Sequence, residues 1–411
     1  MRYGGLIFGL SIVLGAGIAL AATSRKDETA HNGQAYDEIA RGRYLATLGD
    51  CAACHTSEGG KPYAGGEPIE TPFGIVLAAN ITPDPDTGIG SWSDDDFVTA
   101  LQQGKAKNGV HLYPAMPYPY FAKMSRDQIL AIRAYLDTLE PVHHQVETDQ
   151  LPFPFKFRLG MVFWNTLFFR GAAFQPVAGK SNEWNRGAFI VEGPGHCAAC
   201  HTPKNFLGGD KTGEPLVGAT LQGWFAPNLT NDQRSGIADW SADDIVAYLK
   251  NGHDRHAAAT GTMAQVIADS TSQMRDSDLK AIATYLKDIP APHQPTAQAV
   301  AQNDPAMRAG RAIYVDNCEA CHAGDGTGVA NLVPPLKDSP TVQSPDPTTL
   351  ARVVLHGTRN VATTGAPTSP AMPALGWKLT DQQAAAVLTY VRNSWGNAAP
   401  AVSDGEVSKL R

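Results

Sequence analysis

The apolar positions of this chain repeat a helical pattern in three successive stretches. Near the start of each stretch a glycine is followed by large apolar residues, at 42–45, 187–190 and 310–314. Near the end, apolar residues recur at positions i, i+3 and i+4, with a tyrosine at the matching place, at 131–136, 281–286 and 386–391. This spacing predicts amphipathic helices with one buried face. We expect each glycine to let its helix approach another helix closely.

Polar residues mark the ends of further helices. A Ser or Thr stands three residues before an Asp or Gln, the capping-box pattern of a helix start, at Ser93, Ser125, Ser241 and Thr380. In the third stretch the middle helix is expected to start at Asp346 and Pro347 instead, with the proline at the first helical position. We expect the three middle helices to end at a glycine, namely Gly104, Gly252 and Gly357.

This order of helices predicts an all-α fold of three tandem units, for which 411 residues are enough. Unit one is expected to span residues 36–145, unit two 182–290 and unit three 305–397. An aromatic-rich linker lies at 146–181, and a Pro/Ala-rich linker at 291–304 is expected to be extended and solvated. The tail at 398–411 is polar and unpatterned.

An apolar run from Gly4 to Ala22 follows Arg2 at the N-terminus. Small residues at 19 and 21 flank Leu20, as at the cleavage site of a secretory signal. Residues 1–23 are therefore expected to be a signal peptide, or an uncleaved N-terminal anchor, because the run approaches the ~20 residues that span a bilayer. Both interpretations place the body of the protein outside the cytoplasm.

The aromatic-rich linker has a composition of its own. Eight Phe and Trp residues lie between Leu151 and Phe174, interleaved with Lys156, Arg158 and Arg170. The segment is too short and too interrupted by polar residues to cross a bilayer. Three interpretations remain open: a strap packed between units, a docking surface for a partner subunit, and a helix lying in the membrane interface, where it would also admit quinone.

All six cysteines of the chain belong to one motif, Cys-x-x-Cys-His, that occurs three times. The pairs are Cys51 and Cys54, Cys197 and Cys200, and Cys318 and Cys321, followed by His55, His201 and His322. This pattern is typical of c-type haem, in which thioethers hold the porphyrin and the imidazole binds the iron. Disulfides would not explain the histidine, and a structural zinc needs four protein ligands where each motif offers three. The sequence therefore predicts three haem c groups.

A methionine follows each motif and suits the second axial position of the iron. Met116 and Met372 each stand in the tetrapeptide Pro-Ala-Met-Pro, whose prolines stiffen a loop, and Met263 is in register with Met116. Met124 and Met274 compete, but unit three has Leu379 at their place, which favours a hydrophobic contact beside a helix start. Histidine ligands stay open as an alternative, from His111, His253, His256 and His356.

The remaining chemistry is sparse. A formal net charge of −7, with no basic block, argues against nucleic acid as a partner. Asn80 and Thr82 match Asn228 and Thr230 in register, so we interpret these glycosylation-like sequences as loop structure, with a role near the haem propionates left open. No acid–base pair or nucleophile constellation is apparent, so no catalytic residue is expected.

With these motifs in place, the chain resembles the triheme cytochrome c subunit of bacterial membrane-bound dehydrogenases, which serves alcohol, gluconate, sorbitol, fructose and aldehyde dehydrogenases. The resemblance covers about residues 39–397 and rests on the haem motifs and three further stretches, at 71–74, 80–92 and 184–187. It implies three cytochrome c-type domains with the His and Met ligands named above. The lead-in from Ser24 to Glu38 departs from the family and leaves an anchored N-terminus open.

The resemblance also implies a place in electron transport. A catalytic partner subunit (a quinoprotein, flavoprotein or molybdoprotein) would oxidise a substrate on the periplasmic side of the inner membrane. This chain would pass the electrons through its haems to ubiquinone, as a subunit of an oxidoreductase complex without a catalytic site of its own. Two alternatives remain: a haem enzyme with an open iron site, of peroxidase or reductase type, and a free-standing multihaem electron carrier.

Overall fold

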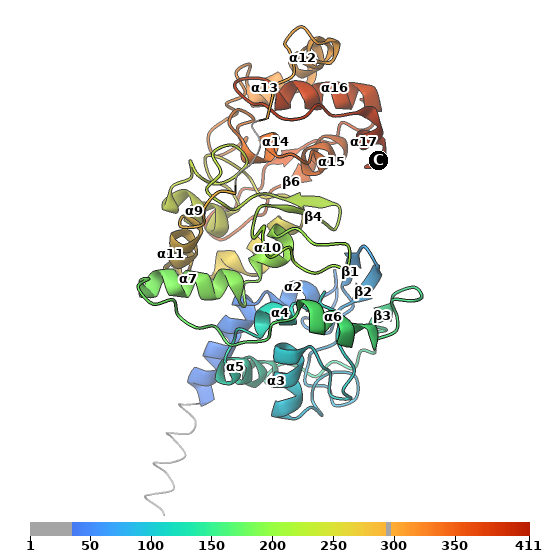
Figure 1. The fold of residues 1–411 in the computed structure, drawn as a ribbon, viewed down its shortest axis with the longest axis vertical. Coiled ribbons are helices and arrows are strands. Elements are labelled where there is room, and N and C mark those ends of the chain that lie inside the picture. The colour runs from blue at the N-terminus through green and yellow to red at the C-terminus, as the bar shows by residue number, and fades with distance from the viewer. Residues whose placement is uncertain (1–34, 293–296) are drawn as a thin grey trace, which may run out of the picture.

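The computed structural model describes residues 35–292 and 297–411, so the expected signal peptide or anchor at 1–23 and part of the linker at 291–304 lie outside the described residues. The fold is mostly helical. The three units follow one another along the longest axis of the molecule, with units one and three at opposite ends (Figure 1). The described residues also form three small antiparallel sheets, which the all-α expectation did not include.

Unit one begins with a helix at residues 35–48 that leads into the first haem motif. Its other elements are α2 (Cys51–His55), β1 (Pro68–Thr71), β2 (Gly74–Leu77), α3 (Asp94–Gln103), α4 (Tyr118–Phe121) and α5 (Arg126–Leu136). A further strand, β3 (Asp149–Gln150), pairs with β2 and ties the start of the aromatic linker to unit one.

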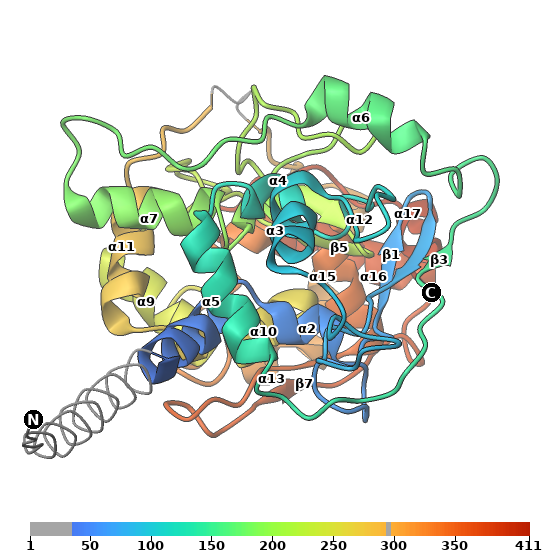
Figure 2. The same cartoon turned by 90° about the horizontal axis from the view of Figure 1, so that it is seen from below.

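The aromatic linker continues along the outside of the molecule. We call residues 151–169 the strap; it contains α6 (Gly160–Phe168). Figure 2 shows α6 at the periphery, beside α4 of unit one. None of the helices among the described residues is long and apolar enough to span a membrane.

Unit two repeats the plan of unit one with one difference. Its elements are α7 (Asn182–Glu192), α8 (Cys197–His201), β4 (Ala219–Leu221), β5 (Trp224–Ala226), α9 (Ala242–Asn251), α10 (Gly261–Asp269), the 3-10 helix η1 (Thr271–Gln273) and α11 (Asp276–Leu286). Met263 lies in α10, whereas Met116 of unit one lies in a loop before α4.

The C-terminal tail at 398–411, which is polar and unpatterned in sequence, packs on unit three. The elements are α12 (Pro305–Asn317), α13 (Glu319–His322), α14 (Pro340–Gln343), α15 (Thr348–His356), β6 (Thr358–Arg359), β7 (Ala371–Met372), α16 (Asp381–Arg392) and α17 (Asp404–Ser408). Val407 of α17 is fully buried in the core of this unit. The buried guanidinium of Arg392 donates to the carbonyl of Pro400 in the tail and to that of Val342.

The first and last helices of each unit cross as closely as the glycines predicted. A Cβ atom would lie 1.7 Å from a backbone carbonyl oxygen at Gly42, 1.9 Å at Gly187 and 2.2 Å at Gly310. The oxygens belong to Ala131, Ala281 and Ala386, on the last helices of the three units. Because packed backbone cannot move aside as the end of a side chain does, only glycine fits at these crossings.

The predicted helix ends are confirmed, with one small correction. All four capping boxes are present, and the glycines at 104, 252 and 357 follow α3, α9 and α15 with positive φ. The helix α15 begins at Thr348, so Pro347 is the residue before the helix and not its first residue. Pro347 is thus the N-cap position, and Asp346, one residue earlier, accepts the N–H of Thr348 at 2.8 Å.

Units one and two share one hydrophobic core, whereas unit three has a core of its own. The first cluster contains Leu48 and Ile129 of unit one together with Ile190 and Leu279 of unit two. The members of the second cluster, Tyr314 among them, all belong to unit three and its tail. Burial of apolar surface is the main stabilising term in folding, so we expect units one and two to unfold as one body.

A buried carboxylate strengthens the contact between units one and two. Asp278 of α11 accepts a 2.5 Å hydrogen bond from the hydroxyl of Tyr44 in unit one and two bonds, of 2.8 and 2.7 Å, from Arg186. Burial acts to raise the pKa of Asp278, but these donors lower it below its ordinary value. The contact therefore contributes its full stabilisation of the folded state above about pH 4, and this stabilisation is lost as the pH falls through the lowered pKa of Asp278.

The hairpin of unit two lies on α15 of unit three. The hydroxyl of Thr349 donates to the Phe225 carbonyl at 3.0 Å and accepts the Phe225 N–H at 2.9 Å. The guanidinium of Arg352 lies 4.8 Å from the ring centre of Trp224. The same ring packs against Gly261, at the start of the helix that carries Met263. Trp224 therefore contacts both Arg352 of unit three and the start of the helix that carries Met263.

Candidate haem sites

Each haem motif forms a short helical segment that presents two thiols and an imidazole together. The helices α2 and α8 contain the complete motifs of units one and two, and α13 begins directly after Cys318. A spacing of three places both cysteines of a motif on the same helix face. The backbone before the first cysteine is left-handed in units one and two, with φ of 52° at Asp50 and 36° at His196. The chain therefore turns sharply into each of these motifs.

The motif histidines are prepared to bind a metal. Burial lowers the pKa of His55, His201 and His322, so all three stay neutral, which is the form that binds iron. Nδ1 of His55 lies 2.6 Å from the Ala79 carbonyl oxygen, and Nδ1 of His201 lies 2.7 Å from that of Pro227. A carbonyl oxygen only accepts, so Nδ1 carries the proton and Nε2 keeps its lone pair for the metal.

Unit three has the same arrangement in a looser form. The Pro334 carbonyl opposes the effect of burial on the pKa of His322, which places it beside the ring. Nδ1 of His322 nevertheless has no hydrogen bond of normal geometry. The imidazoles of His55 and His201 thus share one arrangement, a backbone carbonyl at Nδ1, whereas Nδ1 of His322 has no hydrogen-bond partner.

Burial favours the neutral thiol at four of the cysteines. Burial raises the pKa of Cys51, Cys54 and Cys197 to about 12 and that of Cys318 to about 11. A zinc site or a thioredoxin-like redox pair needs thiolates, which these surroundings disfavour. A thioether sulfur carries no charge, so it suits the same apolar surroundings. The donor set of each motif therefore fits a covalently attached haem.

Met116 lies against the same core as the first motif. Its side chain packs there together with Cys51 and Ala52. The N–H of Met116 donates to the Tyr113 carbonyl at 3.0 Å, and its own carbonyl accepts the Tyr118 N–H at 2.7 Å, so the loop around it is tight. The competing Met124 is fully buried among core side chains, which matches the hydrophobic contact expected of it.

Met263 and Met372 are half-buried and belong to neither hydrophobic cluster of the described residues. Met263 lies in the first turn of α10, whose Gln265 donates to the Ala53 carbonyl of the first haem motif at 3.3 Å. Met372 lies on β7, opposite Thr358 of β6. Because neither side chain fills a core, both sulfurs stay candidates for the iron.

Three of the alternative histidine ligands have other partners. Nδ1 of His111 lies 3.3 Å from the side-chain nitrogen of Asn165, and Nε2 of His356 lies 2.7 Å from the Leu410 carbonyl oxygen. The ring of His256 stacks on Trp240, with 5.1 Å between the ring centres. These contacts favour methionine over histidine as the second ligand. The fourth, His253, lines a cleft of about 660 Å³ between units two and three.

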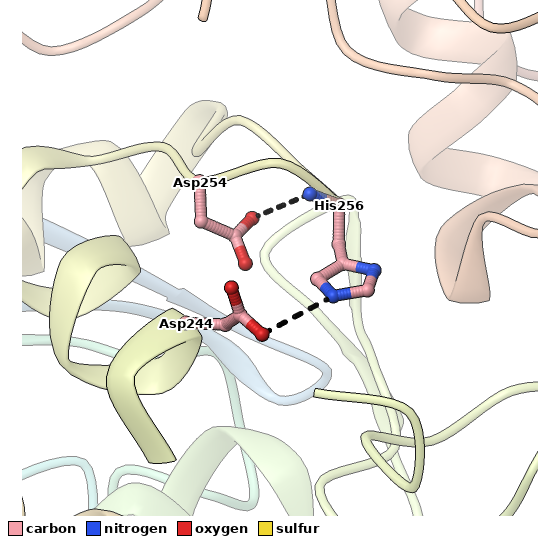
Figure 3. A group of neighbouring side chains, drawn as sticks. All are labelled: Asp244, Asp254 and His256. Carbon is pink, nitrogen blue, oxygen red and sulfur yellow. Dashed lines mark hydrogen bonds and ion pairs between the residues drawn. The ribbon is translucent and has the colours of Figure 1, made fainter. Parts of the chain in front are cut away.

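Two residues of the cleft wall, Asp254 and His256, belong together with Asp244 to a group that has the composition of a metal site. Asp244, Asp254 and His256 direct their ligand atoms toward one another (Figure 3). The carboxylate of Asp244, however, already accepts the N–H and hydroxyl of Ser241 in a capping box and a 2.8 Å bond from Arg255. An arginine thus supplies the positive charge, and the group is explained as a helix cap with its adjoining loop.

The first two motifs adjoin each other across the shared core. Nε2 of His196, directly before motif two, lies 3.3 Å from the carbonyl oxygen of Gly49, just before motif one. Burial raises the pKa of Cys54, and the neighbouring Asp50 and Cys200 add to the effect. The third motif belongs to the separate core of unit three, and its Cys321 is exposed. Groups held by motifs one and two would therefore be close neighbours.

Asp50, directly before the first haem motif, is a buried residue that the sequence did not single out. Its side chain is 7% exposed, and Oδ1 has no hydrogen-bond partner. Burial raises the pKa of Asp50, and Asp269 at the end of α10 adds to the effect, so the neutral acid is favoured. The only signal in the sequence is that a polar residue precedes the first cysteine of every motif, as His196 and Asn317 also show.

The strap has an inner face that packs on units one and two and an outer face that is exposed. On the inner side, the indole N–H of Trp164 donates to the Leu207 carbonyl of unit two at 2.9 Å, and the ring of Phe168 packs against Gly209. On the outer side, Leu159 is 80% exposed and Phe163 66%. The interpretation as a strap between units thus describes one face, and the other face is available for docking.

The paired Asn and Thr residues are internal loop structure. Asn80 and Thr82 are buried, and Asn80 Oδ1 accepts the N–H and hydroxyl of Thr82 at 3.0 and 2.7 Å. Asn228 Oδ1 accepts the N–H of Thr230 at 2.8 Å in the same way. Burial of these side chains removes them from the reach of a glycosylating enzyme.

Comparisons with known proteins agree with this geometry. The model of the cytochrome c family matches the chain three times, at residues 39–140, 186–290 and 307–395. The chain is 41% identical to the gluconate 2-dehydrogenase cytochrome c subunit of Pantoea cypripedii, over 98% of this chain and 94% of that protein. It is 41% identical to the cytochrome c subunit of the alcohol dehydrogenase (quinone) of Gluconobacter oxydans (97% and 87% covered), and 34% identical to the fructose dehydrogenase cytochrome subunit of Gluconobacter japonicus (97% and 87%).

Proposed function

Because the chain belongs to the cytochrome c family, among the cytochrome c subunits of bacterial dehydrogenases, and has an electron-transfer role, we propose that it is a triheme subunit of a periplasmic, membrane-bound dehydrogenase. Electrons would enter from the cofactor of a catalytic partner subunit and leave to ubiquinone. The observation that carries this proposal is the threefold repetition of one donor set, a cysteine pair followed by a histidine, whose Nδ1 is held by a backbone carbonyl in units one and two. The relatives do not favour a haem enzyme with its own open iron site.

The residues of each unit have separate tasks in this role. The two cysteines would hold the porphyrin by thioether bonds, and His55, His201 and His322 would present Nε2 to the iron. Met116, Met263 and Met372 would supply the opposite sulfur ligand, which favours the reduced state. Haem c supplies one-electron transfer between ferric and ferrous iron. The apolar cores around the motifs exclude water, so that the change of charge needs little rearrangement of the surroundings.

The arrangement of the motifs supports transfer within the chain. Motifs one and two adjoin across one core, and the hairpin of unit two contacts α15 of unit three near Met263. Each unit thus has a packed contact with the next. Oxidation of an alcohol or sugar releases two electrons while a haem carries one, so a chain of haems joins a two-electron cofactor to a quinone.

The outer face of the strap is proposed to bind the membrane surface. It exposes Phe153, Phe157, Leu159 and Phe163, and the neighbouring Phe206 of unit two is 88% exposed. Residues 151–170 contain Lys156, Arg158 and Arg170 and no acidic residue, although the whole chain has a net charge of −7. Apolar side chains flanked by basic residues suit an anionic lipid interface.

Replacing Phe157, Leu159 and Phe163 together by serine is expected to weaken binding to vesicles of anionic phospholipid at least tenfold, since each side chain loses about 1.5 kcal/mol of burial in lipid. Trp164 and Phe168 are left in place because they pack inward against unit two. Vesicle flotation measures the effect. Trp377→Ser removes an aromatic that is 83% exposed in unit three and serves as the matched control; equal loss of binding in both variants would contradict the assignment.

The methionine ligands are tested by Met372→His. The variant is expected to lose the weak sulfur-to-iron absorption band of one haem out of three and to lower the midpoint potential of that haem, because a second imidazole favours the ferric state more than a thioether does. Optical redox titration measures both. Met274→Leu, at a buried core position, is expected to keep the full band, and loss of the band in both variants would contradict the ligand assignment.

Purification from native membranes tests the function as a whole. We expect a catalytic dehydrogenase subunit to purify together with this chain, and the complex to reduce a ubiquinone analogue when substrate is added. A chain that purified alone, and that accepted no electrons from any membrane dehydrogenase of its source, would contradict the proposal.

A further inference from the structure

The inner face of the strap brackets the loop that carries Met116. Tyr118, two residues after Met116, donates its hydroxyl to Asn165 Oδ1 at 2.6 Å. Nδ2 of the same amide lies 3.3 Å from Nδ1 of His111, five residues before Met116. One side chain of α6 therefore ties the two ends of this loop to each other, from outside the unit's own helices.

Further contacts hold the same loop to the strap. The guanidinium of Arg158 lies 3.8 Å from the ring centre of Tyr113 and donates to the His111 carbonyl at 3.3 Å. The hydroxyl of Tyr113 donates to the Phe155 carbonyl. The ring of Phe169 meets the fully buried ring of Tyr118 edge to face, with 5.3 Å between their centres. The strap therefore packs against the outer side of the Met116 loop and contacts the residues at both ends of that loop.

The protonation states suit this arrangement. Burial lowers the pKa of His111, and the charge of Lys105 lowers it further, so the neutral ring offers Nδ1 as an acceptor for the Asn165 amide. The hydroxyl of Tyr118 donates to the amide oxygen of the same side chain. Asn165 satisfies both groups at once, which neither a hydrophobic residue nor a carboxylate does.

We propose that Asn165 is a positioning residue for the iron ligand of unit one, and that the strap controls how firmly Met116 holds that iron. The inference rests on the role of Met116 proposed above. No contact between Asn165 and the haem is required, because the residue acts through Tyr118 and His111. The ligand segments of the other units are held differently: Met263 lies in a helix, and Met372 lies in a strand pair.

Competition with imidazole tests the proposal. Imidazole reaches the iron only when the methionine sulfur has left it, so its apparent affinity reports the fraction of sites that are open. In the full-length, haem-loaded protein, Asn165→Ala is expected to raise the affinity of one haem for imidazole about tenfold and to weaken one third of the sulfur-to-iron band. Thr166→Ala is the control, because that exposed hydroxyl bonds only within its own helix, to the Val162 carbonyl.

The outcomes separate the two proposals. The positioning role is overturned if Asn165→Ala keeps the wild-type melting temperature and the wild-type affinity for imidazole. The ligand assignment still stands in that case, provided that Met116→Ala removes one third of the sulfur-to-iron band. A full band in Met116→Ala overturns the ligand assignment and this inference with it. If Asn165→Ala fails to fold, Tyr118→Phe removes only the hydroxyl that donates to Asn165, and the same rise in imidazole affinity is expected.

Discussion

Gly310→Ala is expected to lower the melting temperature of unit three while units one and two keep theirs. A Cβ at this position would lie 2.2 Å from the Ala386 carbonyl oxygen of α16, so the two helices must separate. We expect a cost of at least about 3 kcal/mol, a large part of the stability of a unit this small, although alanine would otherwise favour the helix by about 1 kcal/mol. Differential scanning calorimetry should show two transitions, of which only one moves.

The matching change in unit two should behave differently. Gly187→Ala would place a Cβ 1.9 Å from the Ala281 carbonyl oxygen, but unit two shares its core with unit one. We therefore expect units one and two to lose stability together while unit three keeps its own transition. Gly405→Ala in α17 is the control, since a Cβ there meets nothing within 4 Å. If each variant shifted one common transition, the division into two cores would be wrong.

The features that the sequence predicted correctly depend on short stretches of chain. The capping boxes at Ser93 and Ser241 join residues three positions apart, so their geometry is decided locally. The glycines at the helix crossings were recognisable because the same residue stands at the same place in three copies. A single copy would not have shown that its glycine meets another helix. The repetition of the glycine in three copies made this contact predictable.

The features that were missed depend on contacts between distant segments. The strand β3 exists because residues 149–150 return to pair with β2, more than seventy residues earlier. The sequence of the tail is polar and unpatterned, yet Val407 lies in the core of unit three and Arg392 donates to the Pro400 carbonyl of the tail. Neither local propensity nor periodicity contains these partners.

The candidate sites divide in the same way. Spacing alone made the cysteines and histidines the candidate haem ligands, because covalent attachment would require them within one helical turn. The carbonyls at Nδ1 come from Ala79 and Pro227, each more than twenty residues after its histidine, and no motif marks them. Asn165 was one polar residue in an aromatic segment, and only the fold brings it to Tyr118 and His111.

Removing the cysteine pair of one motif is expected to remove one haem and leave two. Cys318→Ala with Cys321→Ala deletes both attachment points of unit three, so the haem content should fall by one third, measured by haem absorbance per mole of protein and by mass spectrometry. The same loss is expected for the pair Cys197 and Cys200. A haem content that stayed at three after either double change, or that started below three, would contradict one haem per motif.

The potentials of the remaining haems should depend on which pair is removed. Motifs one and two adjoin, so the charge on an iron held at one motif would act on an iron held at the other across a core of low dielectric. Loss of the haem at Cys197 and Cys200 should shift the midpoint potential of the haem in unit one by up to about 60 mV, a tenfold change for a one-electron couple. Loss of the haem at Cys318 and Cys321 removes a charge from the separate core of unit three, and the haem in unit one should keep its potential. Equal shifts in both double variants would mean that the three haems interact as one uniform chain, and the grouping of units one and two would then have no electronic consequence.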